Sequence, residues 1–225
     1  MAQISWRKNK KGDPMSDTPL TPELYLIMDL AKSPDPLPEF EAVRAVAPII
    51  SVLIKENENH LPTNALISTI QAHNIAVLLE DTEKVKQLGA DGVHLTSTEE
   101  DAYLTAQKQL GGDHIIGINP KSSRHTAMEL AEKGASYIAL EKLDDENDTN
   151  NTQETNKQPP NISWWISLFE TPCIAWNITT GPQALQAQTT GADFLALAPS
   201  YWQQGDNTKS TIENLQTILT KQARS

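Results

Sequence analysis

Aromatic side chains follow two apolar segments near the carboxyl end of the sequence. Trp176 comes directly after the apolar segment 171–175, and Tyr201 and Trp202 come shortly after the apolar segment 194–198. If these segments are strands that end at the same rim, the three rings could stack on a planar heterocycle. They could equally fill a disused pocket with apolar surface. The sequence leaves both interpretations open.

Residues 177–182, Asn-Ile-Thr-Thr-Gly-Pro, have the composition of a helix N-terminus. Polar side chains cap the first exposed N–H groups of a helix, and proline suits the first helical position. The same N–H groups favour anions such as phosphate. The segment therefore predicts a structural cap or an anion site, with Asn177, Thr179 and Thr180 as the candidate side chains.

A repeated pattern indicates which elements must position these side chains. Gly-Ala-Asp/Ser followed by an apolar run begins at Gly89, Gly134 and Gly191. A glycine just past an apolar-periodic segment is typical of the left-handed residue that ends a helix. A short apolar run after it is typical of a strand buried on both faces. Each repeat therefore predicts a helix-to-strand junction.

The spacing of the repeats predicts the topology. Gly89 and Gly134 are 45 residues apart, which suits two strand-helix units and is too long for one. Apolar segments between and before the repeats bring the expected strands to eight, with segments of helical period between them. Such alternation fits an open doubly wound sheet or a closed (βα)8 TIM barrel, and eight strands favour the TIM barrel. The expected strands outside the repeats are 24–28, 49–54, 75–79, 113–118 and 171–175.

Charge and cysteine content exclude several classes of function. Eighteen Lys and Arg against 29 Asp and Glu give a net charge of −11, which disfavours nucleic acid and anionic membranes as partners. The single cysteine, Cys173, cannot form an internal disulfide. No apolar run approaches the ~18 residues that cross a bilayer. We expect a cytoplasmic protein whose partner is a small molecule.

Two segments are expected to lie outside the barrel framework. Residues 1–22 contain basic residues and Gly-Asp-Pro but no apolar core, so we predict a flexible N-terminal arm and no secretory signal. Residues 23–225 are expected to form one domain. Residues 144–161 within it contain no hydrophobic residue, which predicts a mobile polar loop. Two interpretations of this loop stay open: a lid over the barrel and a tolerated surface insertion.

Four segments carry a family resemblance, in order, within residues 23–202. They are Glu-Leu-Tyr-Leu-Ile-Met-Asp at 23–29, Leu-Gly-Ala-Asp-Gly-Val-His-Leu at 88–95, Ile-Ile-Gly at 115–117 and Gly-Ala-Ser-Tyr-Ile at 134–138. Together they resemble the thiamine phosphate synthase and thiazole tautomerase superfamily. The resemblance implies a reaction in which hydroxymethylpyrimidine diphosphate loses pyrophosphate and a thiazole phosphate nitrogen captures the pyrimidine cation. It also implies Mg²⁺ and a phosphorylated heterocycle as ligand.

The resemblance implies particular site residues after the strands. Lys55 would grip the diphosphate, although Leu53 stands where the family carries an arginine. Asp81 and Glu99 would be the carboxylate ligands of Mg²⁺, while Glu99 also fits the acidic first turn of a helix. Asn119 would bind a phosphate oxygen.

Later loops depart from the family pattern. Its Gly-Gly pair after the seventh strand is here Trp176-Asn177. Its Val-x-Ser element near the eighth strand corresponds loosely to Ala198-Pro199-Ser200, which implies Ser200 as a candidate phosphate-binding residue, but Pro199 has no N–H to donate. These departures predict lost or much reduced synthase activity. The alternatives are a non-catalytic barrel that binds a thiamine-related or other heterocyclic ligand as a sensor or partner protein, and an isomerase that needs no diphosphate site. We expect His94 to be a framework residue of its strand.

Overall fold

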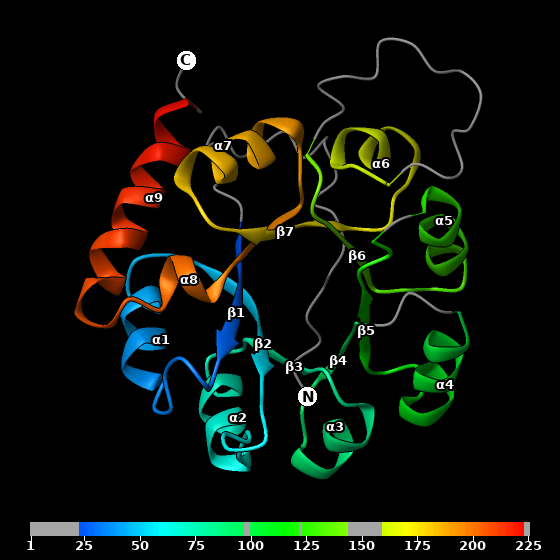
Figure 1. Ribbon diagram of the computed structural model, residues 1–225, viewed down its shortest axis with the longest axis horizontal. Coiled ribbons are helices and arrows are strands. Elements are labelled where there is room, and N and C mark those ends of the chain that lie inside the picture. Colours follow the sequence, from blue (N-terminus) through cyan, green and yellow to red (C-terminus); the bar gives the residue numbers. More distant parts are fainter. Residues whose placement is uncertain (1–22, 97–99, 122, 144–158, 223–225) are drawn as a thin grey trace.

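The computed structural model describes residues 23–96, 100–121, 123–143 and 159–222. Eight parallel strands form a closed barrel in sequence order, and the helices surround it (Figure 1). The expected TIM barrel is therefore confirmed. The strands are β1 (Glu23–Asp29), β2 (Ile49–Lys55), β3 (Ala76–Leu79), β4 (Gly92–Leu95), β5 (Ile115–Ile118), β6 (Tyr137–Leu140), β7 (Cys173–Ile178) and β8 (Phe194–Leu197).

The helices lie between consecutive strands and after the last one. A short helix and a 3₁₀ turn separate β8 from the long C-terminal helix. The helices are α1 (Leu37–Arg44), α2 (Asn64–Gln71), α3 (Thr82–Leu88), α4 (Glu100–Leu110), α5 (Arg124–Glu132), α6 (Ile162–Leu168), α7 (Gly181–Thr190), α8 (Pro199–Trp202), the 3₁₀ helix η2 (Gly205–Asn207) and α9 (Thr208–Gln222).

The first strand closes the ring. Leu26 of β1 lies opposite Val52 of β2 on one side and opposite Leu197 of β8 on the other. Because all neighbouring strands are parallel, their carboxyl ends meet at one rim of the barrel. The loops after the strands are thereby brought together at this rim, which we call the carboxyl rim.

The glycines of the three repeats adopt the expected left-handed conformation. The backbone angle φ is 72° at Gly89, 95° at Gly134 and 102° at Gly191. Gly89 and Gly191 are the C-caps of α3 and α7, and Gly134 lies one residue beyond the C-cap of α5. The prediction of three helix-to-strand junctions is confirmed.

The third residue of each repeat explains why the pattern recurs. Its side chain accepts a hydrogen bond from a backbone N–H of the preceding strand, and its own N–H donates to a carbonyl of that strand. An Asp or Ser here therefore ties each of these strands to its predecessor. The side-chain bonds are Val77 N to Asp91 Oδ2 at 2.8 Å, Ile116 N to Ser136 Oγ at 3.0 Å and Cys173 N to Asp193 Oδ2 at 2.8 Å.

Buried side chains form two clusters because the strands alternate between two covered faces. The larger cluster fills the space between the strands and the helices. The smaller cluster fills the inside of the barrel, so the ring is a packed core and not a pore. Its members are Tyr25, Ile27, Leu53, Ala76, Leu78, Tyr137, Ala139, Ile174, Phe194 and Ala196.

Asn161, the last residue of the expected polar loop 144–161, is held at the start of a helix. Asn161 begins α6: its Oδ1 accepts a hydrogen bond from Trp164 N at 2.8 Å, and the residue is 1% exposed. Residues 144–158 and the expected arm 1–22 lie outside the described residues. Among the helices that the structure describes, none is long and apolar enough to cross a membrane. The cytoplasmic location stays a prediction.

Candidate functional site

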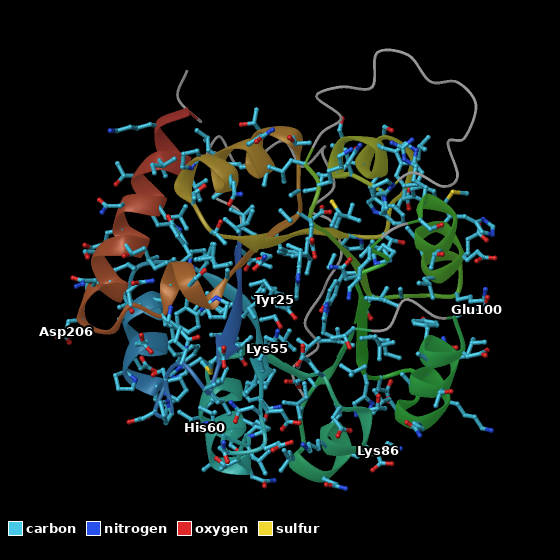
Figure 2. All side chains as sticks on the ribbon, in the orientation of Figure 1. Tyr25, Lys55, His60, Lys86, Glu100 and Asp206 are labelled. Atoms are coloured by element: carbon cyan, nitrogen blue, oxygen red, sulfur yellow. The ribbon has the colours of Figure 1, made fainter. Side chains whose placement is uncertain are left out.

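The carboxyl rim and the barrel interior below it hold most of the candidate residues. Tyr25 and Lys55 lie in the central part of the molecule, whereas Lys86, Glu100 and Asp206 lie at its periphery (Figure 2). Tyr25 belongs to the interior cluster, and Lys55 is the last residue of β2. The site is therefore described from the interior outward to the rim.

Three buried side chains form a hydrogen-bonded chain across the barrel interior. The Tyr25 and Tyr137 hydroxyls are 3.0 Å apart, and the Tyr137 hydroxyl is 2.8 Å from His94 Nδ1. None of the three residues is more than 2% exposed. Because a buried polar group without a partner is costly, this chain fixes the relative positions of β1, β4 and β6.

Gly117 of β5 makes room for the Tyr137 ring. A Cβ added at Gly117 would lie only 1.9 Å from Tyr137 Cζ, so the ring lies directly against the backbone of the neighbouring strand. The glycine in the segment Ile-Ile-Gly is thus required by packing inside the barrel.

Trp176 covers this buried chain. Its ring stacks on His94, with ring centroids 4.2 Å apart and planes 8° apart, and meets Tyr25 edge-on at 5.5 Å. Burial lowers the pKa of His94 to about 3, and the positive charge of Lys55 acts in the same direction. His94 is therefore neutral at pH 7 and hydrogen-bonded, as expected for a framework residue.

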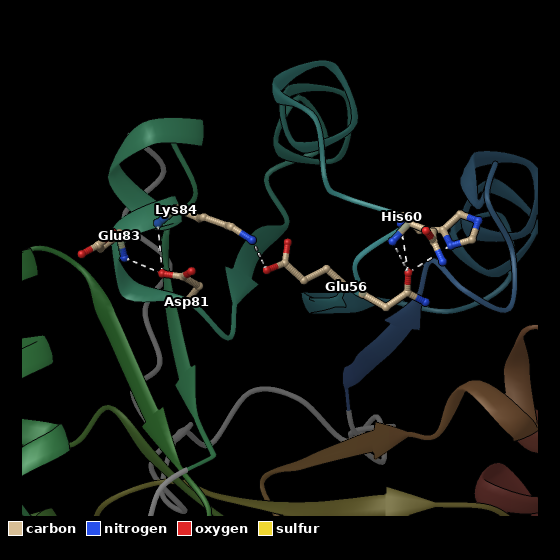
Figure 3. Close-up of polar contacts among 7 residues, drawn as sticks. Glu56, His60, Asp81, Glu83 and Lys84 are labelled. Carbon is tan, nitrogen blue, oxygen red and sulfur yellow. Dashed lines mark hydrogen bonds and ion pairs between the residues drawn. The ribbon is translucent and has the colours of Figure 1, made fainter.

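Lys55 faces a carboxylate at the rim. Its Nζ is 3.9 Å from Oε1 of Glu80, and Glu80 is the first residue after β3. Burial raises the pKa of Glu80; Lys55 opposes that shift, and the negative charges of Glu56 and Asp29 add to it. Glu56 in turn pairs with Lys84 of α3 (Figure 3). On this side of the rim, each of the two lysines has a carboxylate partner.

Asp81, a predicted Mg²⁺ ligand, serves as the N-cap of α3. Its Oδ1 accepts hydrogen bonds from Glu83 N at 2.8 Å and Lys84 N at 3.4 Å (Figure 3). Glu99, the second predicted ligand, lies outside the described residues. Among the residues that the structure describes, no group of three or more His, Cys, Asp or Glu could hold a metal ion. Among the described residues, Mg²⁺ therefore finds the Asp81 carboxylate but no set of three protein ligands.

The segment 177–182 forms the structural cap that its sequence allows. Thr180 Oγ1 accepts a hydrogen bond from Gln183 N at 3.3 Å, and Thr179 donates its N–H and hydroxyl to Gln183 Oε1 at 3.0 and 2.8 Å. Asn177 is exposed and left-handed, with φ of 60°. Asparagine is among the few non-glycine residues that adopt this conformation readily, so the backbone keeps a shape that glycine favours.

The predicted patch of three aromatic rings is not assembled. Trp202 is fully buried in the outer cluster, and its Nε1 donates to Ile27 O at 2.9 Å. Tyr201 also packs against the outer cluster. Both residues follow β8 on the short helix α8, whose rotation per residue turns them away from the interior. Ser200 on the same helix is exposed, and only Trp176 belongs with the interior rings.

Asn119 is buried just after β5 and organises the opposite side of the rim. The residue is 5% exposed; its Oδ1 accepts from Lys121 N at 3.0 Å and its Nδ2 donates to Glu141 Oε1 at 3.1 Å. A cavity of about 520 Å³ opens beside it. The cavity is lined by Asn119, Lys121, Ala139, Leu140, Glu141, Lys142, Pro159 and Pro160.

Lys121 is a rim residue that the sequence did not single out. Its backbone is left-handed, with φ of 43°. The one signal in the sequence was an Asn-Pro-Lys segment directly after an expected strand, which on its own reads as a turn.

Comparison with proteins of known structure supports the architecture. A thiamine phosphate pyrophosphorylase from Pyrococcus furiosus superposes with a TM-score of 0.67 at 17% identity, covering 92% of this chain and 99% of the other. An orotidine 5′-phosphate decarboxylase from Pyrococcus horikoshii gives a TM-score of 0.60 at 14% identity, covering 87% and 99%. At such identities the likeness shows the fold alone.

Sequence comparison is more specific. A thiamine-phosphate synthase of Erythrobacter litoralis is 31% identical over 196 residues, which cover 84% of this chain and 92% of that protein. One of Rhodospirillum centenum is 34% identical over 139 residues, covering 59% and 63%. Residues 54–201 match the family described as thiamine monophosphate synthase. From the barrel, the order of its motifs and these matches, it follows that the chain belongs to the thiamine monophosphate synthase family.

Proposed function

We propose that the protein binds a phosphorylated heterocycle at the carboxyl rim and catalyses the coupling of hydroxymethylpyrimidine diphosphate with a thiazole phosphate. The observation that carries the proposal is the position of Lys55. Its ammonium group lies at the rim, close enough to the interior rings to lower the pKa of buried His94. A diphosphate held there would leave the attached pyrimidine ring within reach of aromatic surface from Trp176.

The coupling reaction suits a site without a general base. The C–O bond between the pyrimidine methylene and the diphosphate breaks, and pyrophosphate leaves with the electron pair. The lone pair of the thiazole ring nitrogen then forms the new C–N bond. No proton has to be removed in these steps, so a neutral His94 that titrates near pH 3 is no obstacle. The protein must instead stabilise the negative charge that develops on the leaving diphosphate.

We propose that Mg²⁺ enters with the diphosphate substrate. Protein sites commonly hold Mg²⁺ through one or two carboxylates together with substrate phosphates. Only one oxygen of Asp81 caps α3, so this carboxylate can contribute a ligand. Removing Mg²⁺ with a chelator tests the requirement directly.

A second candidate function is ligand binding without turnover. Two observations favour it. The Lys55 ammonium is 3.9 Å from the Glu80 carboxylate, so a diphosphate must compete with a charge already in place. Trp176 stacks on His94 and so occupies space at the top of the interior. A barrel with these features could hold a thiamine-related heterocycle as a sensor or partner protein.

The experiment combines a product assay with calorimetry. The full chain is incubated with both substrates, with and without Mg²⁺, and thiamine phosphate is measured by chromatography. The proposal expects product with Mg²⁺, and less product from Lys55→Met. Absence of product, together with binding of a precursor or of thiamine phosphate in the calorimeter, would favour the second candidate. Absence of both product and binding would overturn both.

A further inference from the structure

The last residues of β1 extend beyond the strand that pairs with them on one side. β8 ends at Leu197, whereas β1 continues past the paired residues to Asp29. In a parallel pair, alternate residues of a strand direct their backbone groups to opposite neighbours. Leu30 N donates to Lys55 O of β2 at 3.2 Å. The backbone groups of Ile27 and Asp29 therefore face the side on which β8 has already ended.

The helix α8 lies beside β1 (Figure 1), and two side chains at its end take over the hydrogen bonds on that side. Trp202 Nε1 donates to Ile27 O at 2.9 Å. Gln203 Oε1 accepts the Asp29 N–H at 2.8 Å, and Gln203 Nε2 donates to Asp29 O at 3.2 Å. A side-chain amide supplies an acceptor and a donor together, so one residue satisfies both backbone groups of Asp29.

Gln203 is itself held in place by its surroundings. The residue is 2% exposed. On one side of it, Trp202 O accepts a hydrogen bond from Thr208 Oγ1 of α9 at 2.9 Å. On the other side, Gly205 N donates to Glu39 Oε1 of α1 at 2.7 Å. Because its neighbours are tied to two helices, Gln203 presents its amide to β1 from a fixed position.

The end of β1 is in turn joined to the rim lysine. Asp29 lies opposite Lys55 in the pairing of β1 with β2. Lys55 is the last residue of β2, and its Nζ lies 3.9 Å from Glu80 Oε1. The amide of Gln203 therefore acts on Lys55 through the backbone of Asp29.

We propose that Gln203 is a positioning residue of the carboxyl rim, which fixes the end of β1 and thereby the place from which Lys55 reaches a diphosphate. The role given to Lys55 rests on the proposed function, whereas the hydrogen bonds that fix Asp29 do not. Charge stabilisation requires a group at a defined point, and a misplacement of about 1 Å can cost about 100-fold in rate. The closure of the ring between β8 and β1 would in this way be linked to the site.

The test replaces the amide and measures how the rim holds a diphosphate. Gln203→Met keeps the length of the side chain but loses the donor and acceptor that serve Asp29. By titration calorimetry, we expect inorganic pyrophosphate to bind this variant about fivefold more weakly than wild type. In the synthase assay, the KM for hydroxymethylpyrimidine diphosphate should rise and the KM for the thiazole phosphate should not, because only the diphosphate is assigned to Lys55.

Trp202→Phe is the matched control. It removes the hydrogen bond to Ile27 O from the same contact between α8 and β1, so it should lower the free energy of unfolding. Its pyrophosphate affinity should nevertheless stay at the wild-type value, because the bonds to Asp29 remain. A measurement without ligand accompanies both variants: the backbone amide signals of Asp29 and Lys55 should shift in Gln203→Met.

The outcomes separate this inference from the proposed function. Unchanged pyrophosphate affinity in Gln203→Met, an unmoved Lys55 signal, or an equal loss of affinity in Trp202→Phe would overturn the positioning role. If such a result accompanies product formation by the wild type, the proposed function stands. If the wild type forms no product but binds pyrophosphate, and only Gln203→Met weakens that binding, the positioning role stands and the proposed function fails. Absence of pyrophosphate binding in the wild type would overturn both.

Discussion

The barrel interior and the carboxyl rim are built by different physical means, although they share the same strands. In the interior, Tyr25, Tyr137 and His94 are buried, hydrogen-bonded to one another and covered by Trp176. At the rim, Lys55 and Glu80 form a longer pair that solvent reaches. The difference indicates that substitutions in the interior change stability, whereas substitutions at the rim change what the protein binds. Four predictions test that separation.

The largest effect is expected from Gly117→Ala. The added Cβ would lie 1.9 Å from Tyr137 Cζ, so the ring or β5 must shift. We expect the free energy of unfolding to fall by about 3 kcal/mol, as in other overpacked cores. Urea denaturation measures the change. Gly112→Ala is the control, because no atom lies within 4 Å of a Cβ added there. Equal losses in both variants would show that the tight contact has no special cost.

Tyr137→Phe should have the next largest effect. The substitution keeps the ring but leaves the Tyr25 hydroxyl and His94 Nδ1 without this partner in a buried site. We expect a loss of about 2 kcal/mol in the free energy of unfolding. Tyr201→Phe removes a hydroxyl that makes no hydrogen bond within the described residues, and should change stability by less than about 0.5 kcal/mol. If Tyr137→Phe left the free energy of unfolding unchanged, the hydrogen bonds inside the barrel would not stabilise it.

The pH dependence of stability should report His94. Burial lowers its folded-state pKa from 6.5 to about 3, so below pH 6.5 the unfolded chain binds a proton that the folded protein excludes. This contribution to stability is complete above pH 6.5 and is lost as the pH falls toward 3. Between these two pH values the free energy of unfolding changes by up to about 1.4 kcal/mol per pH unit. The difference between wild type and His94→Gln isolates the contribution, and the exposed His125 provides the control substitution, His125→Gln. Parallel pH profiles for wild type and His94→Gln would contradict a buried neutral imidazole.

The smallest effect on stability is expected at the rim. A double-mutant cycle of Lys55→Met and Glu80→Gln should give a coupling energy below about 1 kcal/mol, decreasing with added salt. The effect on pyrophosphate affinity should be easier to measure than the effect on stability. Glu80→Gln removes the carboxylate that pairs with Lys55 and should tighten pyrophosphate binding about threefold. A coupling energy as large as the loss in Tyr137→Phe would erase the distinction between interior and rim.

The architecture was accessible from the sequence because its signals are local. The three Gly-Ala-Asp/Ser repeats predicted helix ends, and their glycines have the positive φ angles that such ends require. The expected strand 49–54 became β2 with one residue added at its end. The strand expected at 171–175 begins and ends later, at Cys173–Ile178, because apolar runs give the existence of a strand more reliably than its limits.

The candidate site was less accessible because it depends on side-chain directions. Trp176 and Trp202 read alike in the sequence, yet one stacks on His94 and the other is buried against the outer cluster. That outcome depends on the direction in which α8 turns the side chains that follow β8. A helix of four residues is too short to show a hydrophobic periodicity in the sequence. The pairing of Lys55 with Glu80 likewise joins the last residue of β2 to the first residue after β3. Lys121 was missed because its position depends on a backbone conformation that lysine seldom adopts.

The left-handed backbone at Asn177 bears on how this barrel could be re-engineered. With a φ of 60°, the main chain at this turn already follows a path that glycine adopts freely. Exchanging Asn177 for glycine should therefore need no rebuilding of the loop, and β-branched replacements should be the ones rejected in a saturation library.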